Sequence, residues 1–139
     1  MSGSPARFRR RPARRLLGER GAAAVEFALV VPVLLVLLFG IIEFSKALNT
    51  QATLSAAARE GARTMITAGT VATALTAVQN AAGALGLPAT AVSIVPATCV
   101  GAPANTTVTV TITYRQVFAS GVLGSTGVTL TGTAAMRCS

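Results

Sequence analysis

The sequence predicts an α+β protein in which a long N-terminal helix and a second, short helix carry a small antiparallel sheet. The first observation is an apolar run from Ala22 to Ile42 that contains one charge, Glu26, and is followed by a polar stretch rich in small residues. The second is the recurrence of apolar residues at three- and four-residue steps up to about residue 85, which indicates helices. The third is an alternation of apolar residues with threonine beyond residue 90, which is typical of half-buried strands.

The positive charge of the chain is concentrated ahead of the apolar run. Residues 1–21 contribute +6 of the net charge of +8, because seven arginines stand against Glu19. These arginines are Arg7, Arg9, Arg10, Arg11, Arg14, Arg15 and Arg20. The segment also contains Pro5 and Pro12 and shows no apolar periodicity, so we expect disorder over residues 1–20. Arginines beside an apolar span stay on the cytoplasmic side, which predicts a basic cytoplasmic leader over residues 1–21.

Two other interpretations of the arginines stay open. An arginine run can bind nucleic acid, but no aromatic platform or basic domain accompanies this one, so we expect no nucleic-acid partner. Arg14-Arg15-Leu16-Leu17 could instead belong to a twin-arginine export signal, although the run that follows is long and strongly apolar.

The apolar run has the length of a membrane span. A helix of its 21 residues rises about 31 Å, close to the roughly 30 Å of hydrocarbon in a bilayer. An ionisable side chain inside such a span is costly and indicates a function, so Glu26 is a candidate site residue. The run is too long for an ordinary secretory signal cut near Ser45-Lys46-Ala47. A cut before the run, behind the small residue Gly21, would leave the helix in the mature protein.

The long helix is predicted to continue from Glu43 to about Ala68 and to stop at Gly69. Its apolar stripe consists of Phe44, Ala47, Leu54, Ala58, Gly61 and Met65. Two local ion pairs are expected on it, Glu43 with Lys46 and Glu60 with Arg63.

A second helix is predicted from about Thr70 to Leu85, where Gly83, Gly86 and Pro88 end it. It carries one core-facing stripe, which consists of Val71, Leu75, Val78, Ala82 and Leu85.

Strands make up the rest of the chain. A short strand holds Val92 and Ile94 and is stopped by Pro96, and a longer one alternates apolar residues with threonine over residues 107–114. A last strand covers residues 128–136, after a loop marked by Ser120-Gly121, Gly124-Ser125 and Gly127. Two or three antiparallel strands packed on the helices would complete the α+β head, because a sheet this small needs helix cover.

Two cysteines flank the long strands. Cys99 precedes the longer strand and Cys138 ends the last one, with 38 residues between them. Antiparallel order could bring them together, and closing a loop near 40 residues implies roughly 4 kcal/mol of stabilisation in the chain-entropy model. We expect a disulfide if the head lies outside the cytoplasm; the alternative is two free buried thiols.

The composition argues against catalysis. The chain has no His, no Asp and no Trp, so it cannot form a Ser/His/Asp triad or a His-containing zinc site, and two cysteines cannot make a tetrathiolate site. We therefore expect no enzyme, no catalytic residue, no metal and no cofactor. An envelope enzyme would require a cleft that converges on Glu26, Glu43 or Glu60.

Two motifs carry a resemblance to a known family. Gly21, followed by Glu26-Phe27 and a long apolar helix, resembles the class III signal of type IV pilins. Together with the segment Ala56-Ala57-Ala58-Arg59-Glu60-Gly61-Ala62-Arg63, it resembles the TadE-like minor pilins, or pseudopilins, of the tight-adherence (Flp) pilus system. The C-terminal strands are a weaker third marker, and the resemblance covers roughly residues 18–137.

This resemblance implies a pilin-like fold and a set of roles. A prepilin peptidase would cut after Gly21, so that the mature chain begins at Ala22, and Glu26 with Phe27 would guide subunit registration. The freed amine of Ala22 lies one turn before Glu26, so a neighbouring helix displaced by about one turn could bring an amine to that carboxylate. The alternative is that Glu26 lies near the cytoplasmic interface, where its own side chain is long enough for the carboxylate to reach water. Arg59, Glu60 and Arg63 are either a contact segment or a solvated face.

The domain organisation that follows is a cleaved leader over 1–21, a transmembrane assembly helix over 22–42 and an extracytoplasmic α+β head over 43–139. The expected partners are the prepilin peptidase, other pilins or pseudopilins, inner-membrane assembly proteins and the lipid bilayer. The expected location is the cytoplasmic (inner) membrane, as a single-pass protein, or the surface pilus, with a role in cell adhesion. The alternative function is an uncleaved bitopic membrane anchor of an envelope or secretion complex.

Overall fold

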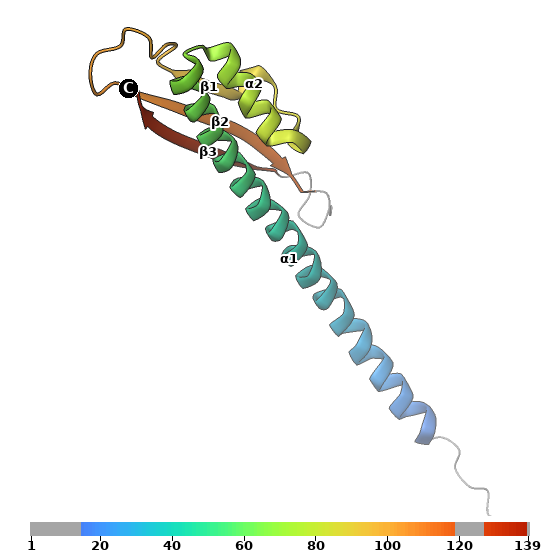
Figure 1. Ribbon diagram of the computed structural model, residues 1–139. Helices are drawn as coiled ribbons and strands as arrows, with labels where there is room; N and C mark the ends of the chain where they lie inside the picture. Colours follow the sequence, from blue (N-terminus) through green and yellow to red (C-terminus); the bar gives the residue numbers. More distant parts are fainter. Residues whose placement is uncertain (1–14, 119–126, 139) are drawn as a thin grey trace, which may run out of the picture. The chain divides into compact units, whose positions relative to one another are not determined.

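The computed structural model describes residues 15–118 and 127–138, with side chains from residue 21 onward. Its elements confirm the α+β class: a long apolar helix, a short second helix and a three-stranded antiparallel sheet (Figure 1). The chain divides into an N-terminal unit that ends at Leu38 and a C-terminal unit that starts at Phe39. The sheet, the second helix and the core all belong to the C-terminal unit.

Helix α1 (Arg15–Ala68) has 54 residues and starts earlier than predicted. The expectation of disorder is wrong for residues 15–20, because after Pro12 this stretch contains leucine, arginine and glutamate, which all favour helix. The helix continues without interruption through Pro32 and Gly40. It ends at Gly69 as predicted, where a φ of 71° suits glycine and the backbone N–H donates to the carbonyl of Met65 at 3.0 Å.

Helix α2 (Val71–Ala82) begins at the N-cap Thr70, whose Oγ1 accepts a hydrogen bond from the backbone N–H of Thr73 at 3.4 Å. The 3-10 helix η1 (Gly83–Leu85) extends it, and a second one, η2 (Ala89–Ala91), precedes the sheet. The fully buried residues of α2 are Ala74, Val78 and Ala82. The predicted stripe is therefore correct at two positions, whereas Val71, Leu75 and Leu85 are only half-buried.

The sheet has the order β1–β2–β3 and is antiparallel throughout. Strand β1 (Val92–Val95) ends before Pro96, while β2 (Thr107–Val117) and β3 (Gly127–Arg137) pair over their whole length, from Thr107 with Arg137 to Val117 with Gly127. All three predicted strands form, and β2 extends three residues beyond Tyr114. The predicted loop at Ser120-Gly121 and Gly124-Ser125 lies outside the described residues.

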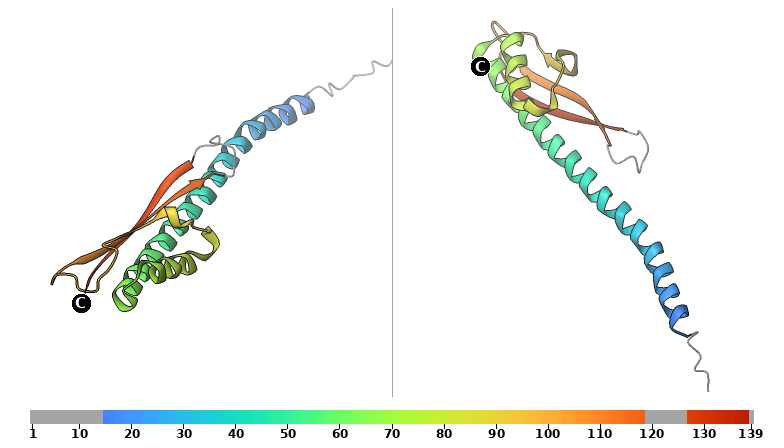
Figure 2. Two further views of the ribbon diagram at one scale, coloured as in Figure 1. Left: turned by 90° about the horizontal axis from the view of Figure 1, so that it is seen from above. Right: turned by 90° about the vertical axis from the view of Figure 1, so that its right-hand side faces the viewer.

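One face of the sheet packs on the helices, as Figure 2 shows for the C-terminal unit. The buried residues of β2 alternate along the strand and are Val108, Val110 and Ile112. They form one core with residues of α1 and α2, the largest of which are Leu54, Met65 and Val78. The threonines between them face away from the core, in agreement with the period of two.

The stripe predicted on the second half of α1 is correct at Leu54, Ala58, Gly61 and Met65, which are all buried. It is wrong at Phe44, whose side chain is 65% exposed. Phe44 precedes Leu54 by ten residues, which on an ideal helix leaves the two side chains about 80° apart around the axis. Among the described residues, the sheet covers the Leu54 side of the helix and leaves Phe44 exposed.

Candidate functional site

The residues predicted for processing and registration all lie on α1 in the N-terminal unit. Gly21, Ala22, Glu26 and Phe27 are exposed there, and the side chain of Phe27 is 71% exposed. From Gly21 onward this helix is long and apolar enough to cross a membrane, and its apolar window is not buried by the other residues that the structure describes. The same unit has a shallow apolar hollow, which is lined by Pro32, Val33, Val36 and Leu37.

Glu26 has no ion-pair partner among the side chains that the structure describes. It lies four residues after Ala22, and therefore about one turn further along the same face of the helix. The structure contains one chain, so the pairing of Glu26 with the amine of a neighbouring chain stays a prediction.

The second predicted group, Arg59, Glu60 and Arg63, lies further along α1 in the C-terminal unit. All three side chains are exposed, whereas Gly61 and Ala62 between them are buried. The expected pair of Glu60 with Arg63 is absent from the ion pairs of the described residues, which are limited to Glu43 with Lys46. The charged side chains of Arg59, Glu60 and Arg63 therefore point to solvent and form no ion pair in the described part of the chain.

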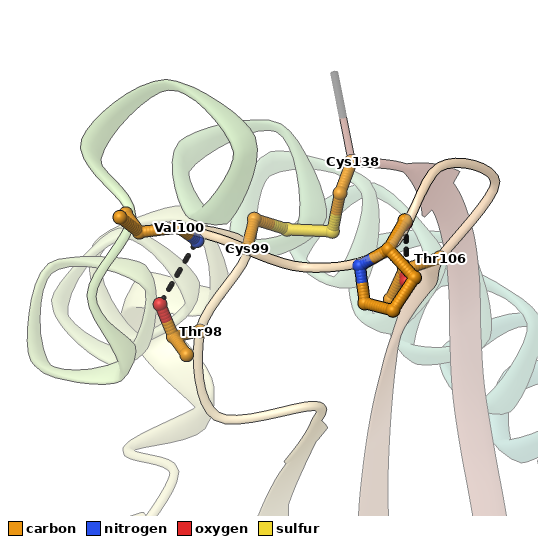
Figure 3. The surroundings of a disulfide bond; sticks show 6 residues. Thr98, Cys99, Val100, Thr106 and Cys138 are labelled. Carbon is orange, nitrogen blue, oxygen red and sulfur yellow. Dashed lines mark hydrogen bonds between the residues drawn. A yellow bond between two sulfur atoms is a disulfide. The ribbon is translucent and has the colours of Figure 1, made fainter.

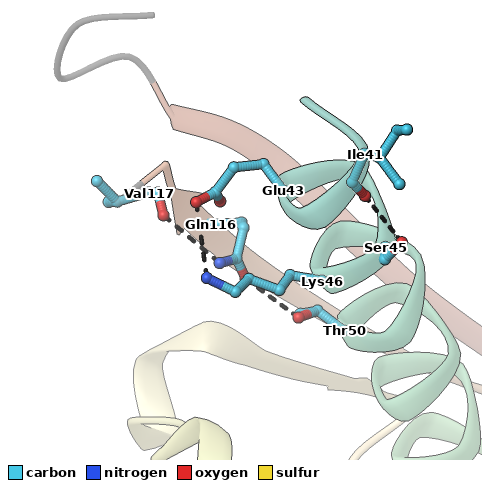
Figure 4. A network of polar contacts seen from close by, with 7 residues as sticks. All are labelled: Ile41, Glu43, Ser45, Lys46, Thr50, Gln116 and Val117. Carbon is cyan, nitrogen blue, oxygen red and sulfur yellow. Dashed lines mark hydrogen bonds and ion pairs between the residues drawn. The ribbon is translucent and has the colours of Figure 1, made fainter. Parts of the chain in front are cut away.

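A polar cluster between α1 and the end of β2 was not predicted as a site (Figure 4). The side chain of Glu43 is 7% exposed, and its nearer oxygen lies 3.6 Å from Nζ of Lys46. Beside it, Thr50 donates a hydrogen bond to Oε1 of Gln116 at 3.1 Å, and Nε2 of Gln116 donates to the carbonyl of Val117 at 3.5 Å. The sequence predicted only the ion pair of Glu43 with Lys46. It did not predict the contact of Thr50 with Gln116, because the two residues are 66 positions apart and no local pattern links them.

The carboxylate of Glu43 is only partly satisfied. Its Oε2 is buried and has no hydrogen-bond partner among the residues that the structure describes. A buried charge needs an opposite charge or hydrogen bonds to offset the lost hydration. Lys46 supplies the opposite charge from a half-exposed position, so Glu43 depends on this one contact.

The predicted disulfide between Cys99 and Cys138 is present, with the two Cα atoms 5.4 Å apart (Figure 3). It joins the β1–β2 connection to the end of β3. Hydrogen bonds order the same connection: the backbone N–H of Cys138 donates to the carbonyl of Thr106 at 2.8 Å, and that of Val100 donates to Oγ1 of Thr98 at 3.0 Å. The bond thus fastens the longest described loop of the head to the sheet.

Among the residues that the structure describes, no three His, Cys, Asp or Glu side chains form a group that could hold a metal ion. The predicted site residues fall into separate places: an exposed N-terminal segment, an exposed charged group and a disulfide. The buried polar cluster around Glu43 is a further place that was not predicted as a site. The first two predicted places both lie on α1.

Residues 21–63 match the family model described as TadE-like protein. Neither a curated protein nor a solved structure matches the chain. The matched segment begins at Gly21, ends at Arg63 and lies wholly within α1, so the match does not include the sheet. Such a family fits a protein associated with the tight-adherence pilus. The predicted resemblance is therefore confirmed over residues 21–63, the part of the long helix that is similar to the TadE-like family.

Proposed function

We propose that the chain is a minor pilin or pseudopilin that is needed for assembly of a tight-adherence (Flp-type) pilus. A prepilin peptidase removes residues 1–21, so the mature protein begins at Ala22. Residues 22–42 then anchor the protein in the cytoplasmic membrane, and residues 43–139 lie outside the cytoplasm. Its function is structural: it binds other pilins or pseudopilins and the inner-membrane assembly proteins.

The observation that carries this proposal is the family match that starts at the expected cleavage residue, Gly21. The exposure of the apolar helix supports it, because no described residue outside the helix covers its apolar window. Uncovered apolar surface is unfavourable in water by roughly 25 cal/mol per Å², so lipid or neighbouring helices must cover it.

Glu26 supports the same function through its charge. A carboxylate one turn inside an apolar helix is unfavourable in a bilayer unless a cation neutralises it. Cleavage after Gly21 would create such a cation, the amine of Ala22, at the positive end of the helix dipole. In a bundle of parallel helices displaced by one turn, the amine of one subunit meets Glu26 of the next.

The N-terminal mass of the membrane protein tests this function. With the cognate peptidase we expect a mature chain that begins at Ala22, and without it the full-length chain. Gly21→Asp should block the cut, because the charged side chain replaces the small residue at the cleavage position. Gly18→Asp is the matched control in the leader and should leave the cut at Gly21 unchanged. A full-length chain in the presence of active peptidase would contradict the proposal and favour the uncleaved membrane anchor.

A further inference from the structure

We propose that the outer face of α1 in the C-terminal unit binds the same face of a second copy of this chain, parallel to it and displaced by about one helical turn. We define the outer face as Leu48, Ala52, Ala56, Arg59 and Arg63, with Phe44 and Glu60 at its two margins. The inference rests on the proposed function, because a span in a common membrane makes the copies parallel.

The outer face is a continuous, uncovered surface. Its residues follow one another at steps of four, four, three and four, which keeps them within an arc of about 80° on an ideal helix. All are exposed, and the two large apolar side chains, Leu48 and Phe44, are 56% and 65% exposed. The core residues Leu54 and Ala58 lie on the other side of the helix, so the described residues of the head pack on that side and leave the outer face exposed.

Lipid does not account for the exposed leucine. The run from Ala22 to Ile42 already fills the roughly 30 Å of hydrocarbon in a bilayer, and Leu48 follows Ile42 by six residues, or about 9 Å of helix. Leu48 therefore lies beyond the hydrocarbon, at a height where another protein surface can cover it. The family match ends at Arg63, so it includes the whole outer face and excludes the sheet.

The shape of the face fits a copy of itself. Leu48 projects, whereas Ala52 and Ala56 form a small-residue surface that lets a second helix approach closely. If one copy is displaced by four residues along the helix, its Leu48 comes level with Ala52 of the other and packs over the hollow beside Ala56. The same displacement brings the Ala22 amine level with Glu26 of the neighbour, so the two contacts are compatible with one arrangement.

The charges of the face also complement a second copy. Glu60 is exposed and makes no ion pair with Arg59 or Arg63 in the described residues, so both signs are available at the same end. In copies displaced by one turn, Arg59 of one chain stands about 4.5 Å of helix rise beyond Glu60 of the other. Because helical side chains lean toward the N-terminus, the guanidinium reaches back to that carboxylate.

Cross-linking between two differently tagged copies in the membrane tests the inference. One copy carries Leu48→Cys and the other Ala52→Cys; the native cysteines are paired with each other, so each added thiol is the one available for reaction. A short thiol cross-linker should give about tenfold more joined product than a control pair in which Thr113→Cys, on the outward face of the sheet, replaces Ala52→Cys. Product no more abundant than in the control overturns the inference.

Two further outcomes identify a different occupant and would also overturn it. Cross-linking of Leu48→Cys to a different protein would mean that another subunit covers the face. A nitroxide on Leu48→Cys that is relaxed by lipid-soluble oxygen, without cross-linking, would mean that lipid covers it.

Charge exchange, measured by the same cross-linking of Leu48→Cys to Ala52→Cys, provides a second test of the inference. Glu60→Arg should lower the cross-linking by roughly two- to fivefold, because an exposed ion pair is replaced by repulsion. Arg59→Glu combined with Glu60→Arg should restore it, since the pair is then reversed in every copy. Failure of the double variant to recover would argue against self-pairing. If the chain is processed normally at Ala22 but the copies do not cross-link, the self-pairing is wrong and the proposed processing stands. If an unprocessed chain cross-links, the proposed processing is wrong and the self-pairing stands.

Discussion

The backbone of Gly132 on β3 lies directly against the backbone of Leu54 on α1. A Cβ atom built on Gly132 would stand 2.5 Å from the carbonyl oxygen of Leu54, closer than non-bonded atoms approach. Backbone cannot move aside as the end of a side chain can, so this contact sets the distance between the sheet and the long helix.

Gly132→Ala should therefore destabilise the head, by about 1–3 kcal/mol as expected for overpacking. The measurement is thermal unfolding of the full chain in detergent, followed by circular dichroism. Thr133→Ala is the matched control, because Thr133 is exposed on the opposite face of the same strand. Equal midpoints for the two variants would contradict the close contact.

Gly61 makes the corresponding contact between the two helices, since a Cβ there would overlap Cγ2 of Val78. We expect Gly61→Ala to lower the free energy of unfolding by about 1–3 kcal/mol. Val78→Ala alone should also destabilise, because it leaves a cavity. In the double variant the new methyl occupies that space, so its loss should be smaller than the sum of the two single losses. Additive losses would show that the two positions do not touch.

Glu43 and Lys46 should respond unequally to loss of charge. Lys46→Met leaves the buried carboxylate of Glu43 without its cation and should cost about 1 kcal/mol, a modest value because Lys46 is half-exposed. Glu43→Gln removes the buried charge itself and should be neutral or stabilising. Urea unfolding of the two variants checks the asymmetry. A greater loss in Glu43→Gln than in Lys46→Met would mean that Glu43 has a further partner.

Reduction of the Cys99–Cys138 bond should lower the free energy of unfolding by roughly 4 kcal/mol, the chain-entropy value for a loop near 40 residues. Unfolding is measured with and without a reductant. The double variant Cys99→Ser with Cys138→Ser should resemble the reduced protein and be insensitive to the reductant. A shift caused by the reductant in that variant would point to an effect outside this bond.

Glu26→Gln should be processed after Gly21 but should fail to assemble, because the amide cannot neutralise the amine of a neighbouring subunit. Pilus yield and the N-terminal mass are measured in the same cells. Glu43→Gln is the control for the loss of one carboxylate from the same helix, and we expect it to assemble. Normal pili with Glu26→Gln would leave the long helix as an anchor and remove the pairing role.

Local patterns were sufficient for most of the elements. The length of the apolar run indicates the long helix, Gly69 indicates where that helix ends, and Thr70 indicates where the next helix begins. The alternation of apolar residues with threonine indicates the strands. Each of these signals depends on residues that are neighbours in the sequence, so it can be recognised without the tertiary structure. The pairing of Cys99 with Cys138 was also predictable, because the chain has two cysteines and antiparallel strand order could bring them together.

The sequence by itself therefore determined the α+β class, the membrane-length apolar helix, the family resemblance and the disulfide. Only the tertiary structure decided which side of α1 is covered, and with it the exposure of Phe44 and Leu48, the burial of Glu43 beside Gln116 and the contact of Gly132 with Leu54. Periodicity marks a helix face as apolar without saying which other element packs on it. That choice depends on contacts between residues far apart in the chain, and among the described residues the sheet packs on one side of the C-terminal part of α1 and leaves the other side exposed.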